Sequence, residues 1–499
     1  ITPMPAERYD QFLSDYRDYI EVEKPSFWKN MAYLFDYQFG YMYFRYFAWN
    51  FIGRQDDVQG KLENDHGNWL SGINFIDSAH LDSQKHLPSD VLNNKARNTY
   101  YFLPFLLGLL GFVFLSMKSE RQTWVILVLF LFTGLALKIY LNERPFEPRE
   151  RDYALVGSFY AFTIWIGLGV YALFSAARKY IHPNIAATAA TVLSLVAVPA
   201  VMAYQNWDDH DRSQKYSAEF IADAYLESVA ENKDAMIFTI GDNDTFLLWY
   251  AQEIEGYRTD VRVINTSLLQ TDWYIDQMKR QAYQSTPIPG QLVHKQYAHG
   301  VREAIYYQKR TDNRWNIKDF VNWITSDDPS TRSSRGAGEY KQDFYYYPTN
   351  KLRIPVNKEN VLKSGIVKPE DADKIVDYID ITLPGAIDKA RIVMLDILAN
   401  NDWKRPIYFT GGSMDSAEYL WMKDYLQLDG LVYKLVPIKT PIDKNNPYDM
   451  GRIDSELMYN IVKRWTWGNM GKEGIYLDPE TRKNSIIFRG NLARLTEQL

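Results

Sequence analysis

Residues Asn142–Tyr153 read NERPFEPRERDY, and this loop decides how the chain is organised. Seven of the ten residues from 143 to 152 are charged, and on either side lie apolar runs long enough to cross a bilayer. Ionised groups at the mouth of a membrane helix bundle are costly unless they are paired, so they mark candidate sites. The loop is therefore the first place to look for function.

The surrounding sequence predicts a membrane domain. Residues 100–204 hold 13 charged side chains, seven of them in this loop. The rest forms four windows that approach or exceed the roughly 18–20 apolar residues of a membrane-spanning helix: Tyr100–Met117, Thr123–Leu141, Ala154–Ala177 and Ala186–Tyr204. The fourth contains Pro199 and gives the weakest signal. The alternative is a set of helices buried in a large soluble core, but four such windows are hard to bury in one.

Bulk composition hides this membrane domain. The mean hydropathy of −0.35 and the 24% of charged residues average over two different solvents. A net charge of −6 argues against a general nucleic-acid binder. Zero cysteines exclude disulfides and Cys-ligated metals. Because the first residue is Ile1 and no signal peptide precedes the first apolar run, we expect a fragment of a longer protein.

Short-loop charge predicts the orientation. Lys118, Arg121, Arg178 and Lys179 lie in the two loops opposite loop 142–153, and the positive-inside rule places such residues in the cytoplasm. Loop 142–153, the N-terminal hundred residues and everything after residue 204 would then share the outer side. Four spans place both large flanks on one side in either orientation.

The N-terminal segment, residues 1–99, is polar except for the aromatic block Phe27–Phe51. This block is typical either of a helix at the membrane interface or of a core helix packed under the outer domain. A Gly- and Asn-rich loop follows. Its acidic and histidine side chains could ligate a cation, although turn formation is the commoner role: Asp56, Asp57, Asp65 and His66.

Residues 205–499 read as a soluble α/β domain. Strand runs at Ala235–Ile240 and Val261–Asn265 alternate with helical patterns at Thr245–Glu255 and Asp272–Tyr283, which predicts a βαβ unit with a partly parallel sheet. Further strands are expected at 406–410, ending in Gly411-Gly412, and at 431–439, with helices at 213–232, 384–399 and 454–465. Residues 284–350 read as irregular, with a polar stretch at Ser326–Gly338 that we expect to be mobile.

The charged loop is the first candidate site. Arginine forks bind phosphate oxygens bidentately and remain charged near a membrane, which suits the phosphate of a lipid-linked sugar. Arg144, Arg149 and Arg151 would bind this phosphate, and Glu147, Glu150 and Asp152 would orient them. The alternative is an internal salt-bridge network that fixes the loop over the spans, and both can hold together.

The second candidate follows the strand at 235–240. In open α/β sheets, ligands gather at the carboxyl ends of strands. Asp242, Asn243 and Asp244 could there hold a divalent cation or hydrogen-bond a sugar, whereas Asp244 or Thr245 could equally be a helix N-cap. A third cluster, Trp207–Arg212, favours a juxtamembrane turn over a metal site. No metal site, nucleophilic triad or bound cofactor is assigned from the sequence.

Longer strings resemble a known family. FEPRERDYALVGSFYAFTIWIGLG, QNWDDHDRS, GDNDTFLLWYAQEIEGYRTDVRVIN and TDWYIDQMKRQ are similar to large bacterial multi-pass membrane proteins related to the transmembrane protein O-mannosyltransferases, glycosyltransferases of the GT-C class. The resemblance runs from about Tyr33 to Arg464. Many bacterial members of that family have been described only as a domain of unknown function.

The resemblance implies an enzyme of the bacterial inner membrane with its active face and large domain in the periplasm. Its partners would be the bilayer, a polyprenyl-phosphate sugar, with mannose as the sugar, and the Ser or Thr of exported proteins. The family's acidic catalytic motif, an aromatic-Asp-Cys-Gly-Glu type of string, is not found in these residues. The chain thus resembles the C-terminal half, with the catalytic residue unknown. The alternative function is a membrane-anchored scaffold of the cell envelope.

Overall fold

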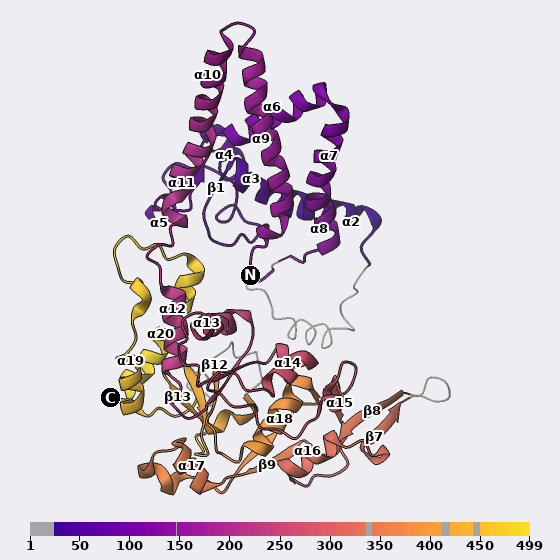
Figure 1. The fold of residues 1–499 in the computed structure, drawn as a ribbon, viewed down its shortest axis with the longest axis vertical. Helices are drawn as coiled ribbons and strands as arrows, with labels where there is room; N and C mark the ends of the chain where they lie inside the picture. Colours follow the sequence, from indigo (N-terminus) through magenta and orange to yellow (C-terminus); the bar gives the residue numbers. More distant parts are fainter. Residues whose placement is uncertain (1–23, 146, 336–341, 411–419, 443–449) are drawn as a thin grey trace. The chain divides into compact units, whose positions relative to one another are not determined.

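The computed structural model describes residues 24–145, 147–335, 342–410, 420–442 and 450–499 (Figure 1). The chain divides into two compact units. The first comprises Ile1–Ser213 with Tyr476–Pro479, and the second comprises Gln214–Ile475 with Glu480–Leu499. The first unit is helical and apolar, and the second is built on mixed sheets. The fold class is therefore a membrane α-helical region joined to an α/β domain with a partly parallel sheet.

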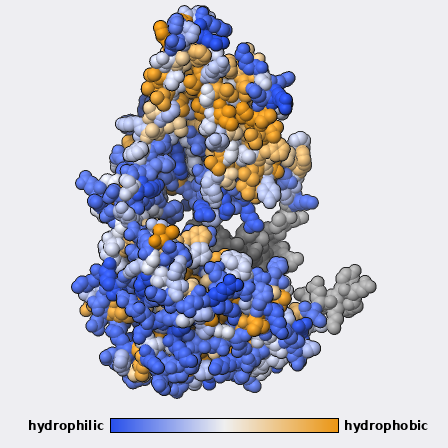
Figure 2. Space-filling model, in the orientation of Figure 1, coloured by the Kyte–Doolittle hydropathy of each residue, from blue (hydrophilic) through white to orange (hydrophobic). Residues whose placement is uncertain are grey.

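Three helices of the first unit are long and apolar enough to cross a membrane: Glu120–Leu141 (α7 to α8), Asp152–Ala177 (through α9) and Pro183–His210 (α10 to α11). The helix in the first predicted window, α6 (Leu103–Lys118), has only 16 residues. At 1.5 Å per residue it is about 24 Å long, shorter than a hydrocarbon core of about 30 Å. The four predicted spans are thus three full-length helices and one short apolar helix. Figure 2 shows hydrophobic side chains gathered over these helices.

The window with the weakest signal forms the longest of these helices. Pro199 lies within a π-helical turn, Val196–Ala200, inside the continuous helix Pro183–His210. A proline cannot donate the regular helical hydrogen bond, and a local change to π geometry accommodates the lost bond. The helix begins at Pro183, where a proline costs no hydrogen bond, and the His182 side chain caps it.

Glycines allow α6 to pack closely against α9 (Val156–Ala177). A Cβ added at Gly111 would collide with the Trp165 carbonyl, and one at Gly169 would collide with the Leu107 carbonyl. Small residues at such contacts let two backbones approach, which is how helices associate in membranes. This contact holds the short helix α6 in the bundle.

The segment that enters the helical bundle contacts the segment that leaves it. The side chains of Asn98 and Tyr100, which precede α6, hydrogen-bond Asn206 near the end of α11 (Val201–His210). Strand β1 (Gly53–Arg54) pairs with β2 (Asn98–Thr99), and Gly60 donates to Glu150 of loop 142–153. Loop 142–153 therefore lies at the same end of the bundle as residues 53–100 and 206, the arrangement expected for helices that alternate in direction.

The aromatic block forms one continuous helix. It runs through α2 (Phe27–Ala32), a π-helical segment (Tyr33–Phe44) and α3 (Arg45–Phe51). Its first rings are exposed, as at Trp28, whereas Tyr43 and Phe47 are buried against rings of the apolar helices. Of the two expectations, the core helix describes the C-terminal half of the block, which packs against the apolar helices of its own unit.

The acidic clusters beside the bundle are used within the fold. Asp56 accepts hydrogen bonds from the backbone of Val58 and Gly67 and from the His66 ring, so it forms a turn. The cluster Trp207–Arg212 is mostly helical rather than a turn. Its first four residues are the last part of α11, in which Asp209 is buried and Trp207 is exposed, and only Asp211 and Arg212 follow the helix, where Asp211 accepts from the Ser213 amide.

The second unit contains a five-stranded sheet in the order β13-β14-β12-β3-β4. Strands β3 (Met236–Thr239), β4 (Arg262–Asn265) and β12 (Ile407–Thr410) are parallel, and β14 (Val432–Leu435) and β13 (Leu426–Asp429) continue antiparallel. Helix α13 (Asp242–Glu253) connects β3 to β4, which confirms the βαβ prediction. Other predicted helices are shorter than expected: α12 (Ser217–Glu227), α14 (Asp272–Met278), α18 (Lys389–Asn401) and α19 (Ser455–Val462).

The prediction that residues 284–350 are irregular is wrong. They contain β5 (Ala304–Tyr307), β7 (Arg332–Arg335), β8 (Gln342–Tyr347) and the amphipathic helix α16 (Ile317–Thr325). With β11 (Ala386–Asp388), these strands form a four-stranded sheet in the order β11-β5-β8-β7. Of the polar stretch 326–338, residues 336–338 lie outside the described residues, as do Gly411 and Gly412.

Candidate functional site

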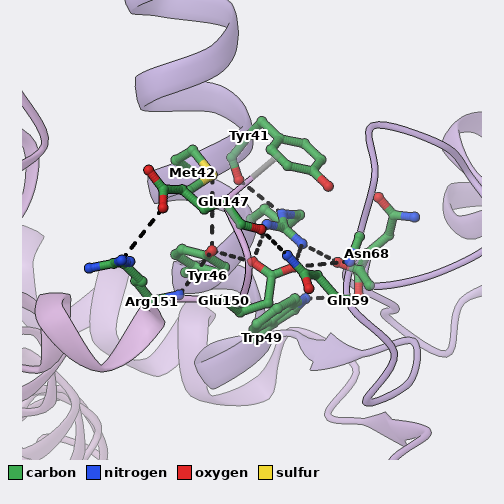
Figure 3. A network of polar contacts seen from close by, with 12 residues as sticks. Tyr41, Met42, Tyr46, Trp49, Gln59, Asn68, Glu147, Glu150 and Arg151 are labelled. Atoms are coloured by element: carbon green, nitrogen blue, oxygen red, sulfur yellow. Dashed lines mark hydrogen bonds and ion pairs between the residues drawn. The ribbon is translucent and has the colours of Figure 1, made fainter. Parts of the chain in front are cut away.

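Loop 142–153 is fixed by an ion pair that reaches it from the aromatic helix. Arg45 forms a bidentate ion pair with Glu150, which is labelled in Figure 3, with Nη1 3.1 Å from Oε1 and Nη2 2.9 Å from Oε2. The hydroxyl of Tyr46 donates to Oε2, and the backbone amide of Gly60 donates to Oε1 at 2.9 Å. Both carboxylate oxygens are thus satisfied, so the loop is anchored to two other segments of the unit.

The surroundings favour the charged forms of this pair. Burial alone would raise the pKa of Glu150, but the hydrogen bonds and charge of Arg45 and the donors on Tyr46 and Gly60 outweigh it, so the pKa lies below its usual range. The Arg45 guanidinium also lies over the rings of Tyr41, Tyr46 and Trp49, at 3.9, 4.7 and 4.8 Å from their centroids. Cation–π contacts of this kind partly replace the hydration that Arg45 loses.

A second buried pair lies at the start of the loop. Lys138 binds Glu143, and both side chains are buried. Gln38 donates to the Glu143 carbonyl at 2.7 Å, and Tyr37 donates to the Arg144 carbonyl at 2.9 Å. The aromatic helix therefore holds the loop backbone directly. Asn142, with a φ of 42°, ends the preceding helix in the left-handed conformation that asparagine tolerates.

The three predicted phosphate-binding arginines differ in their contacts. Arg151 lies 3.5 Å from Glu147, its side chain remains 41% exposed, and its Nε is buried without an acceptor among the described residues. Arg144 and Arg149 are exposed and have no ion-pair partner in the described part of the chain. Cationic groups thus remain available at the surface of an anchored loop.

The expected orienting acids have separate roles. Glu147 pairs with Arg151 and also accepts a hydrogen bond from the Arg144 amide at 3.4 Å. Glu150, expected to orient the loop arginines, instead binds Arg45. Asp152 is half-buried at the start of the next helix. The sequence did not identify Arg45 as the partner of Glu150. The signal that could have indicated it is a single arginine inside an otherwise aromatic block.

The second candidate, Asp242-Asn243-Asp244, lies in the other unit, at the carboxyl end of β3. Asp244 accepts from the backbone amides of Ile240 and Gly241, at 2.8 and 3.0 Å, and from the hydroxyl of Thr410 on β12. Its carboxylate therefore joins two strands and the start of α13. Asp242 and Asn243 are exposed. The structure brings the three residues together but leaves only these two open to a ligand.

Neither candidate has the composition of a metal centre. Across the described ranges, no three His, Asp or Glu side chains gather closely enough to hold a metal ion. The first site is instead a cationic surface on a buried ion-pair anchor, which suits an anion. The second is a hydrogen-bonding edge, which suits polar groups of a larger ligand.

One comparison with known proteins gives a match. Residues 218–457 match the family model of TMEM260-associated domain 2. Curated proteins and solved structures gave no match. The matched region is a little under half of the chain. It lies within the second unit and includes the sheet and the Asp242–Asp244 turn, whereas loop 142–153 lies outside it. The similarity to TMEM260-associated domain 2 therefore concerns the α/β domain.

Proposed function

We propose that this chain is part of a membrane glycosyltransferase that moves a sugar, mannose in the simplest reading, from a polyprenyl-phosphate carrier to Ser or Thr of exported proteins. Two findings support the proposal. The α/β domain is similar to a domain associated with TMEM260, an O-mannosyltransferase-like protein, and the other unit carries apolar helices of membrane-spanning length. The expected location is the bacterial inner membrane, with loop 142–153 and the α/β domain on the periplasmic side.

The observation that carries the proposal is the contrast within loop 142–153. The carboxylate of Glu150 is already paired with Arg45, whereas Arg144 and Arg149 are exposed and unpaired among the described residues. The phosphate of a lipid-linked sugar lies near the membrane surface and is anionic. Arginines at the end of a helix bundle would meet it there with charge-assisted hydrogen bonds.

In transfer, the carrier phosphate leaves as the sugar bonds to the acceptor hydroxyl. Charge grows on the phosphate oxygens, and fixed cations stabilise it because the anchored loop need not reorganise. Arg149 and Arg151 would bind the phosphate and Arg144 would assist. Glu147 would hold Arg151 in place. A carboxylate must also take the proton of the acceptor hydroxyl, and no residue of this chain is assigned to that step.

Replacing Arg149 and Arg151 by Gln in the intact protein tests this role. We expect at least a tenfold loss of O-glycosylated envelope proteins, with an unchanged melting temperature, because both guanidinium groups lie outside the Arg45–Glu150 anchor. The matched control is Arg178→Gln with Lys179→Gln, two basic residues in the loop after α9. Unchanged glycoproteins in the loop double variant would contradict the proposal and favour the scaffold.

A second role is proposed for the β3 edge, because Asp242 and Asn243 are exposed there while Asp244 is internal. These two side chains would contact the acceptor polypeptide or its glycan. Binding of a Ser/Thr-rich acceptor peptide by the full chain should weaken at least fivefold in Asp242→Ala. Glu359→Gln, an exposed acid in the first turn of α17 (Lys358–Ser364), is the control. Equal binding by the Asp242 variant and wild type would exclude this role.

A further inference from the structure

The α/β unit contains a cavity of about 440 Å³ that is separate from the β3 edge. It is lined by the segment after α12, residues 365–368 after α17, strands β13 and β14, and α19 with the residues before it. This volume lies within the range of about 300–1,000 Å³ typical of small-molecule sites. The cavity lies within one unit, so its lining is fixed by that unit's own core.

Part of the lining is a buried ion pair. Lys434 on β14 lies 2.8 Å from Asp429 at the end of β13, and their side chains are 5% and 2% exposed. Gln427 donates to the other Asp429 oxygen at 2.8 Å. Burial alone would lower the pKa of Lys434, but the Asp429 charge raises it, so the lysine stays protonated. A buried pair rarely stabilises a fold more than apolar residues would, which suggests a role beyond stability.

Two further ion pairs lie in the same cavity lining. Lys368 binds Asp454 at 2.9 Å, and Arg452 binds Asp371 at 2.6 Å. The hydroxyl of Tyr408 accepts from the Ala230 amide at 3.1 Å, and its own proton has no acceptor among the described residues. Every cation of these pairs is thus matched by a carboxylate. Apolar side chains, among them Val367, Leu457 and Ile461, also line the cavity.

We propose that this cavity binds a neutral carbohydrate. Ammonium and guanidinium groups keep further N–H donors after pairing, and carboxylates keep further lone pairs. Such alternating donors and acceptors match sugar hydroxyls, each of which both donates and accepts. The apolar side chains suit the C–H groups of a sugar ring. Because every cation of the lining is already paired, a phosphate would meet no uncompensated positive charge there, in contrast to loop 142–153.

This proposal does not rest on the proposed glycosyltransferase function. It uses residues of the α/β unit alone and none of the loop arginines. A carbohydrate site here would recognise a glycan whether or not the chain transfers sugar. The result for the cavity and the result for the loop can therefore differ, and each is read independently.

The test is ligand-observed NMR with the full chain in nanodiscs. The probes are methyl α-mannoside, methyl β-glucoside and methyl β-galactoside, with inorganic phosphate as the anionic probe. We expect at least one glycoside to bind with a Kd on the order of 1–10 mM, the range for a ligand of this size. Lys368→Gln and Arg452→Gln should each weaken this binding at least fivefold.

The matched control is Lys358→Gln, a lysine of α17 in an exposed pair with Asp377 outside the cavity lining. It should bind the same glycoside as wild type does, and the melting temperature of every variant is measured to confirm folding. The proposal is overturned by no glycoside binding up to about 50 mM, by phosphate competing for the site, or by equal binding in the Lys368 and Arg452 variants.

Discussion

Loop 142–153 and the turn Gly241–Thr245 look alike in sequence but differ in structure. Both place acidic residues beside an apolar element. In the loop, Glu150 is held by Arg45 of the aromatic helix, and exposed arginines remain. In the turn, Asp244 is held by the backbone just before it and by Thr410, and an exposed acid and amide remain.

This difference shows that each segment uses one of its carboxylates for internal contacts. In each, one carboxylate fixes the segment and is thereby lost to a ligand. What remains exposed sets the chemistry: cations on the loop, which favour an anion, and neutral or acidic groups at the turn, which favour hydrogen-bonding partners. A dense charge motif therefore says little about its ligand until the internal partners are known.

The largest expected effect comes from breaking the loop's anchor. Glu150→Gln leaves Arg45, whose side chain is 4% exposed, without its counter-charge. Loss of one partner from a buried pair costs about 3–5 kcal/mol, so a clear fall in melting temperature is expected for the detergent-solubilised protein. The double variant Arg45→Met with Glu150→Leu should lose less stability than the single variant, and an equal or larger loss would show that the pair is not the anchor.

The Arg45–Glu150 pair should also make the stability of the protein depend on pH. The pKa of Glu150 is lowered in the folded state, so its contribution to stability is complete above the unfolded value of about 4.3 and is lost as pH falls through the folded value. Melting temperatures followed from pH 7 down to pH 3 should fall more steeply for wild type than for Glu150→Gln. Parallel curves would contradict the ion-pair account.

A smaller effect is expected at the turn. Asp244→Ala removes acceptors for two backbone amides and for Thr410, which should cost about 1–3 kcal/mol of stability of the α/β unit. Asp242→Ala, whose side chain is exposed, should change stability by less than about 0.5 kcal/mol. Chemical denaturation monitored by tryptophan fluorescence measures both. A larger loss for Asp242→Ala than for Asp244→Ala would reverse the assignment of structural and exposed acid.

The smallest expected effect on stability is at Asp223, an acid whose charged neighbours are other acids rather than a cation. Burial and the nearby Glu255, Glu219 and Glu227 raise the pKa of Asp223 to about 6. Because the unfolded value is about 3.9, stability should fall as pH rises from about 4 to 6, opposite in sign to Glu150. Asp223→Asn should stabilise the protein by about 1 kcal/mol at pH 7, after allowance for solvent screening. A destabilised variant would contradict this.

Regular patterns made much of the fold predictable. Apolar windows identified the membrane helices, and strands alternating with helices identified the parallel part of the sheet. In residues 284–350 the pattern is uneven. The apolar residues Ile317, Phe320, Val321 and Ile324 of α16 do carry the i, i+3, i+4, i+7 spacing of an amphipathic helix, so this helix was predictable, whereas the tyrosine-rich β8 has no simple alternation.

The candidate sites were predictable only in part. The sequence indicated the charged loop and the turn after β3, since both are local motifs. Their partners are not local: Arg45 is 105 residues from Glu150, and Thr410 is 166 residues from Asp244. Such pairings depend on tertiary packing, so the sequence could not separate the anchoring acid from the orienting acids.

Binding of an undecorated polyprenyl phosphate to the full chain in nanodiscs tests the central claim most directly. The Arg149→Gln, Arg151→Gln double variant should bind at least tenfold more weakly than wild type, while the Arg178→Gln, Lys179→Gln control binds as wild type does. The affinity of wild type should also fall as salt rises, because the contact is ionic. Equal binding by the loop variant and the control would contradict the proposal that loop 142–153 binds the carrier phosphate.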